Sequence, residues 1–538
     1  MAAPAPPEAG DAQPAAPVEA DDAQPAAPVE ADDAQPAAPV EADDAQPAAP
    51  VEAAPAAAAK APAADPAETE AAPSADAAQE VARIYSKARF SWINPGPYPT
   101  RGWSGYLGLG GSVALRGGSL EAARTPGAGC DAWYAVEPRG YVCAGASATV
   151  DPNDPVVVAL RPHAPRIDSP WPYEYAESTG APRYPRLPSE KEQRRAEWDL
   201  AEHLANVAKA RAAGDDDAIR AIDADLVGVD LKPAGVAAPA LFPFGGLVRE
   251  ARDRIVTGST VAFTRAFDAV DRTWVVTSDQ AYMPKDRLRP YPRSSFQGVW
   301  LKDGRSLPLA FFRKTDRPKY RRGADGRFEP TGASFVRLDW VGLTGRAEVD
   351  GAEPLLETQE PGIYVRAEDA VVIEAAKRSP LDGENDPSSP PRKWIEVSVL
   401  GGWLVAYEEL TPVFATLVSP GRGGVPRKGV PAIETAATPT GRFRIDGKFV
   451  TATMVSSSND NLVHSEVQFV QNFHGPHALH GAYWHDAWGE LKSGGCVNLS
   501  PIDAKQMFAW TDPPVPDGWH GLRASRDAGR STVVLIHR

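Results

Sequence analysis

One cysteine near the C-terminus has the surroundings that acyl transfer requires. Cys496 directly follows Gly494 and Gly495, and His480 lies 16 residues upstream. Glycines let backbone N–H groups turn towards the sulfur and leave room for a substrate carbonyl. A histidine that takes the thiol proton and later returns it to a leaving amine would complete the site. Spacing alone does not separate this chemistry from an inert buried cysteine.

Four motifs around this pair resemble the catalytic domain of L,D-transpeptidases of the YkuD type. In chain order they are WIEVSV with WLVAYE (394–399 and 403–408), TPTGRFRI (438–445), ALHGAYWHD (478–486) and SGGCVNLSP (493–501). The resemblance implies a mostly β catalytic domain over residues 393–538, with the nucleophile near a strand end. It also implies that neither a metal nor an organic cofactor is required.

The resemblance assigns a role to each residue of the site. Cys496 is the nucleophile, His480 is the general base and acid, and the backbone carbonyl of Gly481 orients the imidazole. The same dipeptide occurs at His474-Gly475, and the choice of His480 rests on the resemblance. The backbone N–H groups expected to hold the oxyanion belong to Gly494, Gly495 and Cys496. The residues expected to contact substrate are Tyr483, Trp484, His485, Ser493 and Asn498.

The implied reaction is formation of 3→3 cross-links in peptidoglycan. The cysteine would attack a tetrapeptide stem, release D-alanine and pass the acyl group to a neighbouring stem amine. Peptidoglycan stem peptides are thus the expected partners, and carbapenems the expected covalent inhibitors. With water as acceptor the enzyme would be an L,D-carboxypeptidase.

One departure from the family pattern keeps another function class open. The family motif usually reads Ser-His-Gly-Cys, whereas Gly494 stands at the histidine position here. Its absence leaves the nucleophile and base in place but affects the region of the oxyanion. The competing hypothesis is a catalytically weakened, wall-binding scaffold. Asn498, where many relatives carry arginine, matches a known branch of the family.

Five histidines in the catalytic region raise the question of a zinc site, since imidazole is a common zinc ligand. They are His464, His474, His477, His480 and His485. The sequence contains no HExxH or CxxC motif and no carboxylate at convincing ligand spacing. We therefore predict no metal.

Charge and composition separate a tail from the rest of the chain. Residues 1–80 contain 17 Asp and Glu against Lys60 alone, so the net charge of −15 belongs to this segment. The remainder has no basic excess that would indicate nucleic acid. Residues 11–54 repeat DAQPAAPVEA with a period of 11, and the prolines exclude a helix. We expect residues 1–80 to form a disordered Ala/Pro/acidic tether.

Further segments follow at 81–188, 189–235, 236–378 and 379–392. The first and third are rich in Gly, Trp, Tyr and β-branched residues and resemble bacterial SH3-like β-barrel modules, with a faint third copy ending near residue 370. Residues 189–235 predict a helical hairpin that starts at Ser189, with Trp198 on its buried face. Residues 379–392 are a proline-rich linker. The expected fold is therefore multidomain and mainly β.

The remaining cysteines and the absence of long apolar runs bear on location. Cys130 and Cys143 flank a predicted hairpin, and both a disulfide and two buried thiols are consistent with this pattern. A disulfide would favour an oxidising compartment. No apolar run approaches the ~18–20 residues of a membrane span, and no signal peptide is visible. The resemblance implies the periplasm or cell envelope.

Overall fold

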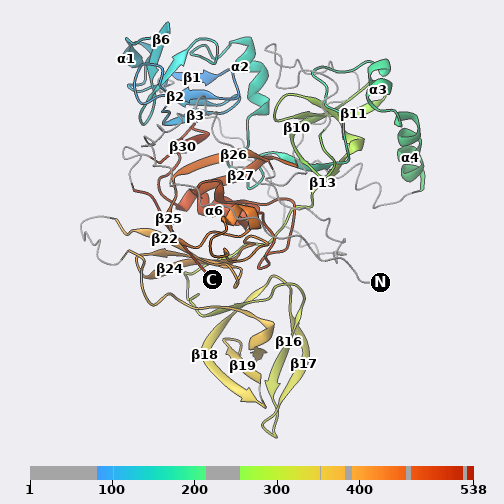
Figure 1. The fold of residues 1–538 in the computed structure, drawn as a ribbon, viewed down its shortest axis with the longest axis vertical. Helices are drawn as coiled ribbons and strands as arrows, with labels where there is room; N and C mark the ends of the chain where they lie inside the picture. The colour runs from blue at the N-terminus through green and yellow to red at the C-terminus, as the bar shows by residue number, and fades with distance from the viewer. Residues whose placement is uncertain are drawn as a thin grey trace, which may run out of the picture. The chain divides into compact units, whose positions relative to one another are not determined.

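The computed structural model describes residues 81–100, 102–213, 255–351, 353–381, 390–455, 462–524 and 530–538. Within these ranges the protein is built mainly of β-strands, which confirms the predicted fold class (Figure 1). The tether over 1–80, the second helix of the predicted hairpin and most of the linker over 379–392 lie outside the described residues.

Two sheets and one helix form the catalytic region. The six-stranded sheet has the order β14 (Val299–Trp300), β24 (Thr411–Leu417), β23 (Trp403–Glu408), β22 (Lys393–Ser398), β31 (Val533–His537) and β25 (Gly441–Arg444). The seven-stranded sheet has the order β2 (Ser91–Ile93), β3 (Gly105–Leu107), β30 (Gly521–Arg523), β26 (Gly447–Val455), β27 (Val463–His474), β28 (His477–Gly481) and β29 (Val497–Leu499). Helix α6 (Pro501–Trp510) lies between them (Figure 1). Leu404, Phe469 and Met507, one from each element, share a single apolar core.

The predicted opening hairpin of this domain is formed by β22 and β23. Trp394 pairs with Tyr407 across the antiparallel ladder, and their rings stack at 4.1 Å. The indole Nε1–H of Trp394 donates to the carbonyl of Glu409 at 2.5 Å. A fully buried indole with its N–H satisfied is the arrangement in which tryptophan stabilises a core.

Strands from upstream of residue 301 complete both catalytic sheets. Gly105 and Tyr106 of β3 pair with Leu522 and Gly521 of β30, and β14 pairs with β24 at the edge of the other sheet. Trp519 packs into the apolar core of residues 81–150. Strands from the segment predicted over 81–188 therefore continue a sheet of the catalytic region.

Four further sheets lie in the region predicted to hold SH3-like modules. Their orders are β4-β1-β8, β5-β6-β7, β12-β11-β10-β9-β13 and β17-β16-β20-β19-β18-β15-β21. Their strands are β1 (Arg83–Ser86), β4 (Ser112–Ala114), β5 (Arg124–Thr125), β6 (Ala132–Ala135), β7 (Tyr141–Ala144), β8 (Ala148–Thr149), β9 (Glu174–Ser178), β10 (Thr260–Ala269), β11 (Arg272–Thr277), β12 (Tyr282–Pro284), β13 (Leu288–Pro290), β15 (Leu309–Phe311), β16 (Arg317–Arg322), β17 (Phe328–Phe335), β18 (Trp340–Asp350), β19 (Glu353–Thr358), β20 (Tyr364–Arg366) and β21 (Val371–Ile373).

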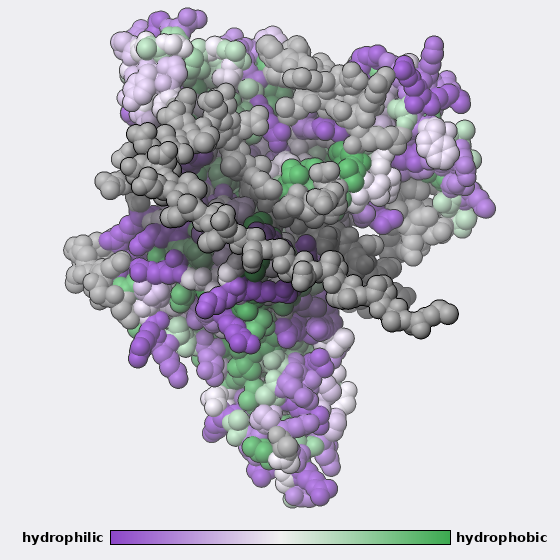
Figure 2. All heavy atoms as spheres, viewed as in Figure 1, coloured by the Kyte–Doolittle hydropathy of each residue, from purple (hydrophilic) through white to green (hydrophobic). Residues whose placement is uncertain are grey.

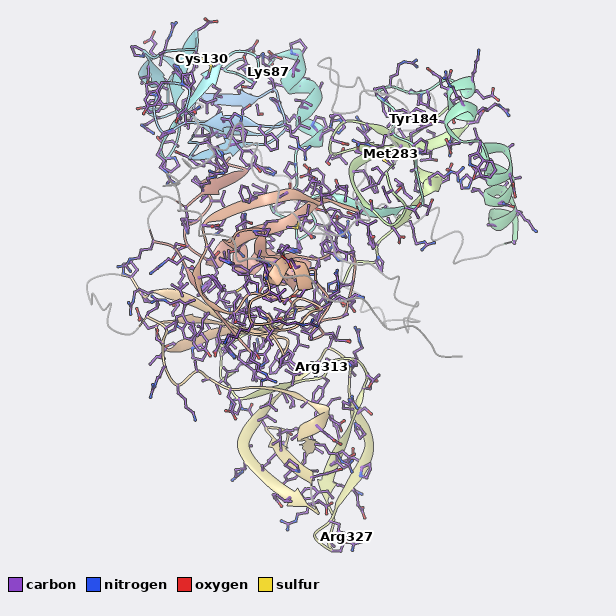
Figure 3. The ribbon with its side chains drawn as sticks, viewed as in Figure 1. Lys87, Cys130, Tyr184, Met283, Arg313 and Arg327 are labelled. Atoms are coloured by element: carbon purple, nitrogen blue, oxygen red, sulfur yellow. A yellow bond between two sulfur atoms is a disulfide. The ribbon has the colours of Figure 1, made fainter. Side chains whose placement is uncertain are left out.

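The similar sequences at 282–288 and 364–370 form the same local structure. In each, a short strand leads into a 3₁₀ turn, at Lys285–Arg287 and Ala367–Asp369, and then into another strand. This agreement is local, and the SH3-like assignment stays a prediction. In Figure 3, Arg327 marks the tip of the β16–β17 hairpin, and Arg313 donates to the Gly489 carbonyl at 2.7 Å.

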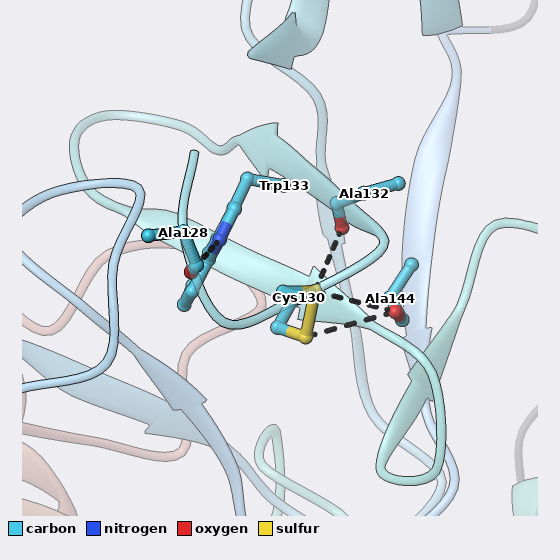
Figure 4. The surroundings of a disulfide bond; sticks show 6 residues. Ala128, Cys130, Ala132, Trp133 and Ala144 are labelled. Carbon is cyan, nitrogen blue, oxygen red and sulfur yellow. Dashed lines mark hydrogen bonds between the residues drawn. A yellow bond between two sulfur atoms is a disulfide. The ribbon is translucent and has the colours of Figure 1, made fainter. Parts of the chain in front are cut away.

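The β6–β7 hairpin carries a disulfide. Cys130 and Cys143 are joined at its open end, where Trp133 is the register partner of Cys143 (Figure 4). The indole Nε1–H of Trp133 donates to the Ala128 carbonyl at 3.0 Å. The hairpin and the loop that precedes it are therefore tied together.

The predicted helix starting at Ser189 is interrupted where we expected it to continue. Helix α3 (Glu190–Ala196) begins with a Ser189–Glu192 capping box, and α4 (Leu200–Ala213) starts after a break. Glu197 and Asp199 in the break pair with Arg272 and Arg287, which pulls the backbone out of helical register. Trp198, predicted on the buried face, is 87% exposed. Buried ion pairs thus override the helical periodicity.

The other described helices are short. They are α1 (Leu120–Ala123), α2 (Pro155–Leu160) and the 3₁₀ turns Arg161–His163 and Ala432–Thr435. In the described ranges, every helix is too short or too polar to cross a membrane. Hydrophilic residues cover much of the face seen in Figure 2, with smaller hydrophobic areas between them.

The close packing where β3 meets β30 can be tested by adding a single methyl group to Gly105. A Cβ at Gly105 would lie 2.2 Å from the ring of Trp519 and 2.6 Å from the Gly521 carbonyl, so Gly105→Ala must displace one of them. We expect a loss of about 1–3 kcal/mol in the free energy of unfolding, measured by denaturant titration. Gly102→Ala is the control, since its Cβ would meet only the Thr100 hydroxyl at 3.9 Å. Equal stability of the two variants would contradict this packing.

Candidate active site

The parallel pairing of β28 with β29 brings the predicted base and nucleophile together. His480 is the register partner of Asn498, and Cys496 directly precedes β29. Side chains two residues apart on an extended chain share a face, so Cys496 and Asn498 lie on the side of the sheet that carries His480. Cys496 and Ala478 belong to one apolar core, whereas Leu479 and Val497 belong to the core on the opposite face.

The tautomer of His480 is set by its own strand. Its Nδ1–H donates to the carbonyl of Gly481 at 3.0 Å, as the resemblance implied. The proton on Nδ1 leaves a lone pair on Nε2, which is the atom that acts as a base. Burial lowers the pKa of His480 to about 4, so the imidazole is neutral at physiological pH.

The loop before the nucleophile is braced from within. The Ser493 hydroxyl donates to the Cys496 carbonyl at 2.6 Å and accepts the N–H of Gly495 at 3.1 Å. The Thr438 hydroxyl reaches the same carbonyl at 3.4 Å and accepts the N–H of Gly421 at 2.8 Å. Of the three predicted oxyanion donors, the N–H of Gly495 therefore has a partner within the loop, the Ser493 hydroxyl. Ser493, predicted to contact substrate, is 1% exposed and shapes the loop.

The aromatic residues after His480 are buried. Tyr483 stacks on Tyr175 at 3.7 Å, and its hydroxyl donates to the Ser465 carbonyl at 2.7 Å and lies 2.5 Å from Thr260 Oγ1. Its polar end is thus engaged by the protein itself. The Trp484 ring lies 4.2 Å from that of His464 and 5.9 Å from that of His480, and it forms an apolar wall beside the base.

His485 and Asn498 form a contact beside the catalytic strands. The Nε2 atom of His485 lies 3.2 Å from Asn498 Nδ2, and its Nδ1 accepts the Ala487 N–H at 3.2 Å. Burial lowers the pKa of His485 to about 3, so this imidazole is also neutral. Ser419 pairs with the backbone of Asn498 in both directions, at 2.9 and 3.0 Å, and fixes the strand that carries it.

Two carboxylates that position the site were not singled out from the sequence. Asp503, fully buried at the start of α6, accepts the Gly298 N–H at 2.9 Å and the Thr416 hydroxyl at 2.6 Å. Asp486 accepts the Ser294 hydroxyl at 2.6 Å and the indole Nε1–H of Trp488 at 2.7 Å. For Asp503 a signal was present, because Ser-Pro-x-Asp at 500–503 is typical of a helix start.

A metal site finds no support in the part of the chain that the structure describes. No group of three or more His, Cys, Asp and Glu side chains there has a geometry suited to a metal ion. The histidines instead have other surroundings: His480 donates to Gly481, His485 contacts Asn498, and His464 lies against Trp484.

The pairing of β28 with β29 places Cys496 and His480 on one face of the seven-stranded sheet. Residues 392–534 match the family model of the YkuD L,D-transpeptidase catalytic domain. The chain therefore carries a YkuD-type catalytic domain, as the four motifs indicated. A comparison with curated proteins gave no match.

Solved L,D-transpeptidase structures are similar to part of the chain. One from Xylanimonas cellulosilytica is 23% identical over 29% of this chain and 67% of its own, with a TM-score of 0.18. One from Enterococcus faecium is 19% identical over 28% of this chain and 50% of its own, with a TM-score of 0.20. The catalytic domain from E. faecium acylated by ertapenem is 21% identical over 28% of this chain and 100% of its own, with a TM-score of 0.20. The chain thus spans about two thirds of the length of the first of these structures and half of the length of the second.

The backbone at Gly495 is testable by substitution. Its φ of +139° is a conformation that L side chains rarely adopt, and a Cβ there would lie 3.0 Å from His477 Nε2 and 3.1 Å from the Ala437 carbonyl. We expect Gly495→Ala to cost about 1–3 kcal/mol of stability and to abolish acylation of Cys496 by ertapenem, followed by mass spectrometry. Gly145→Ala is the control, since its φ lies outside the region that L side chains avoid and its Cβ would meet nothing within 4 Å. Full acylation of Gly495→Ala would contradict this geometry.

The resting protonation state of the pair gives a second prediction. Because burial lowers the pKa of His480 from 6.5 to about 4, its basic form persists as the pH falls well below neutral. We expect the acid limb of the pH–rate profile for ertapenem acylation to lie nearer 4 than 6.5. We also expect no thiolate absorbance at neutral pH, relative to Cys496→Ser. A strong thiolate band would instead indicate a thiolate–imidazolium pair with a raised imidazole pKa.

Proposed function

We propose that this protein is a peptidoglycan L,D-transpeptidase that forms 3→3 cross-links through a thioester on Cys496. The observation that carries the proposal is the pairing that sets His480, with its tautomer held by Gly481, on the same face as Cys496. A nucleophile, a base and a group that orients the base are the elements of covalent acyl transfer.

In the proposed acylation step, His480 Nε2 accepts the thiol proton as the sulfur attacks the carbonyl of the third stem residue. Negative charge develops on the carbonyl oxygen, and the N–H groups of Gly494 and Cys496 stabilise it; a single such donor is typically worth about 3 kcal/mol. The imidazolium then protonates the amine of the departing D-alanine, and the thioester remains.

In the second step an acceptor amine from a neighbouring stem attacks the thioester. His480 takes the proton of that amine, the carbon–sulfur bond breaks, and the thiol recovers its proton from the imidazolium. Water in place of the amine would give a tripeptide and make the enzyme an L,D-carboxypeptidase. Buried Tyr483 and Trp484 favour the amine, because an apolar wall beside the base limits access of water.

A wall substrate places the protein in the periplasm or cell envelope. The Cys130–Cys143 disulfide supports an oxidising compartment. Carbapenems are the proposed covalent inhibitors, as their acyl carbonyl would meet the same thiol. The sheets over residues 81–378 would orient the catalytic domain on the wall, whether or not they bind it.

The second candidate is a wall-binding scaffold with a silent site. The observation that favours it is Gly494, where the family motif has a histidine. Cys496 and His480 are nevertheless both present and buried, His480 in β28 and Cys496 directly before its partner strand β29, which favours the enzyme.

We predict turnover that depends on the cysteine. Purified protein incubated with disaccharide-tetrapeptides should release D-alanine and yield cross-linked dimers, detected by mass spectrometry, and Cys496→Ala should yield none. His480→Ala should lower the rate by at least about a hundredfold, because the general base is lost. His474→Ala, which alters the other His-Gly dipeptide on an exposed turn, should behave as the native protein.

Each other outcome points elsewhere. Cysteine-dependent tripeptide without dimers would establish a carboxypeptidase. Absence of turnover by a folded native protein, together with binding to isolated peptidoglycan, would establish the scaffold.

A further inference from the structure

His477 is a buried histidine that the proposed mechanism does not use. It begins β28, three residues before His480, and is 4% exposed. Its Nδ1–H donates to the His474 carbonyl at 3.2 Å, so the neutral ring has its lone pair on Nε2. Burial lowers its pKa below the ordinary value, which keeps the ring neutral.

The Nε2 atom of His477 faces the loop that carries the nucleophile. A Cβ built on Gly495 would lie 3.0 Å from this atom, which puts the ring directly against the backbone beside Cys496. The Cys496 sulfur lies 3.8 Å from the carbonyl of Pro476, the residue before His477. The start of β28 therefore contacts both the thiol and the loop.

This acceptor has no hydrogen-bond partner among the described residues, although it is completely buried. An unsatisfied buried acceptor is destabilising by about 1–3 kcal/mol, so its retention needs a reason. Tight packing is not a sufficient reason, because a phenylalanine ring would fill the same space without the polar atom. A backbone donor that reaches Nε2 when Cys496 is acylated is a sufficient one.

We propose that His477 is a positioning residue of the acyl-transfer site, whose Nε2 accepts the N–H of Gly495, in place of the Ser493 hydroxyl, when Cys496 is acylated. The imidazole missing at position 494 is thus supplied beside Gly495 by the neighbouring strand. This inference rests on the proposed function, since it concerns the rate at which Cys496 is acylated.

Three variants separate the shape of the ring from its acceptor. His477→Ala removes both, His477→Phe keeps a ring of similar size without the acceptor, and His477→Gln restores an acceptor at similar reach. His474→Ala is the matched control, because it removes an exposed histidine from the adjacent turn but leaves the carbonyl that holds Nδ1. Thermal unfolding of every variant establishes that the fold is kept.

The measurement is acylation of the full chain by ertapenem, with the limiting rate and the half-saturating concentration determined separately. We expect His477→Phe and His477→Ala to lower the limiting rate about a hundredfold with little change in half-saturation, since small displacements of catalytic groups have effects of this size. His477→Gln should recover at least a tenth of the native rate, and His474→Ala all of it.

The two proposals fail in different ways. A native-like limiting rate in folded His477→Phe, with the native protein active, overturns the role of His477 alone. An increase in the half-saturating concentration with an unchanged limiting rate also overturns it, because it would indicate a binding contact. A native protein that is neither acylated nor active on stem peptides contradicts the proposed function, and the role of His477 with it.

Discussion

The register between β28 and β29 is the constraint on which the site depends. Parallel strands need a long connection, and here 15 residues separate Gly481 from Val497. Because strand side chains alternate between faces, a slip of one residue would turn either His480 or Cys496 into the opposite core. The proposed acyl-transfer chemistry therefore requires one particular pairing at the edge of the seven-stranded sheet.

Several buried polar contacts hold that pairing in place. Ser419 bonds the backbone of Asn498 in both directions, and Ser493 and Thr438 both reach the carbonyl of Cys496. Directly after β29, Asp503 at the start of α6 bonds Thr416 of the other sheet. These groups act on the backbone of the strand rather than on a substrate. Buried hydrogen-bonded groups of this kind define a unique arrangement, since any other leaves polar atoms unpaired.

Segments upstream of residue 301 are part of the same framework. β2 and β3 extend the sheet that carries the site, and β14 extends the other catalytic sheet. Tyr175 stacks on Tyr483, and Ser294 bonds Asp486, so residues far upstream hold both sides of the segment that follows His480. The contacts of Tyr175 and Ser294 thus shape the surroundings of the segment that follows His480.

The sequence by itself determined the class of the domain and placed the candidate residues of its site. The motifs around Cys496 and His480, the opening hairpin at Trp394 and the β-rich composition are local patterns, and the structure agrees with them because each is fixed by near neighbours. Only the tertiary structure decided the surroundings: that Trp198 is exposed, that Ser493 braces the loop, and that His477 lies against Gly495. These outcomes depend on ion pairs, sheet extension and packing between segments distant in the chain, which periodicity and spacing do not encode.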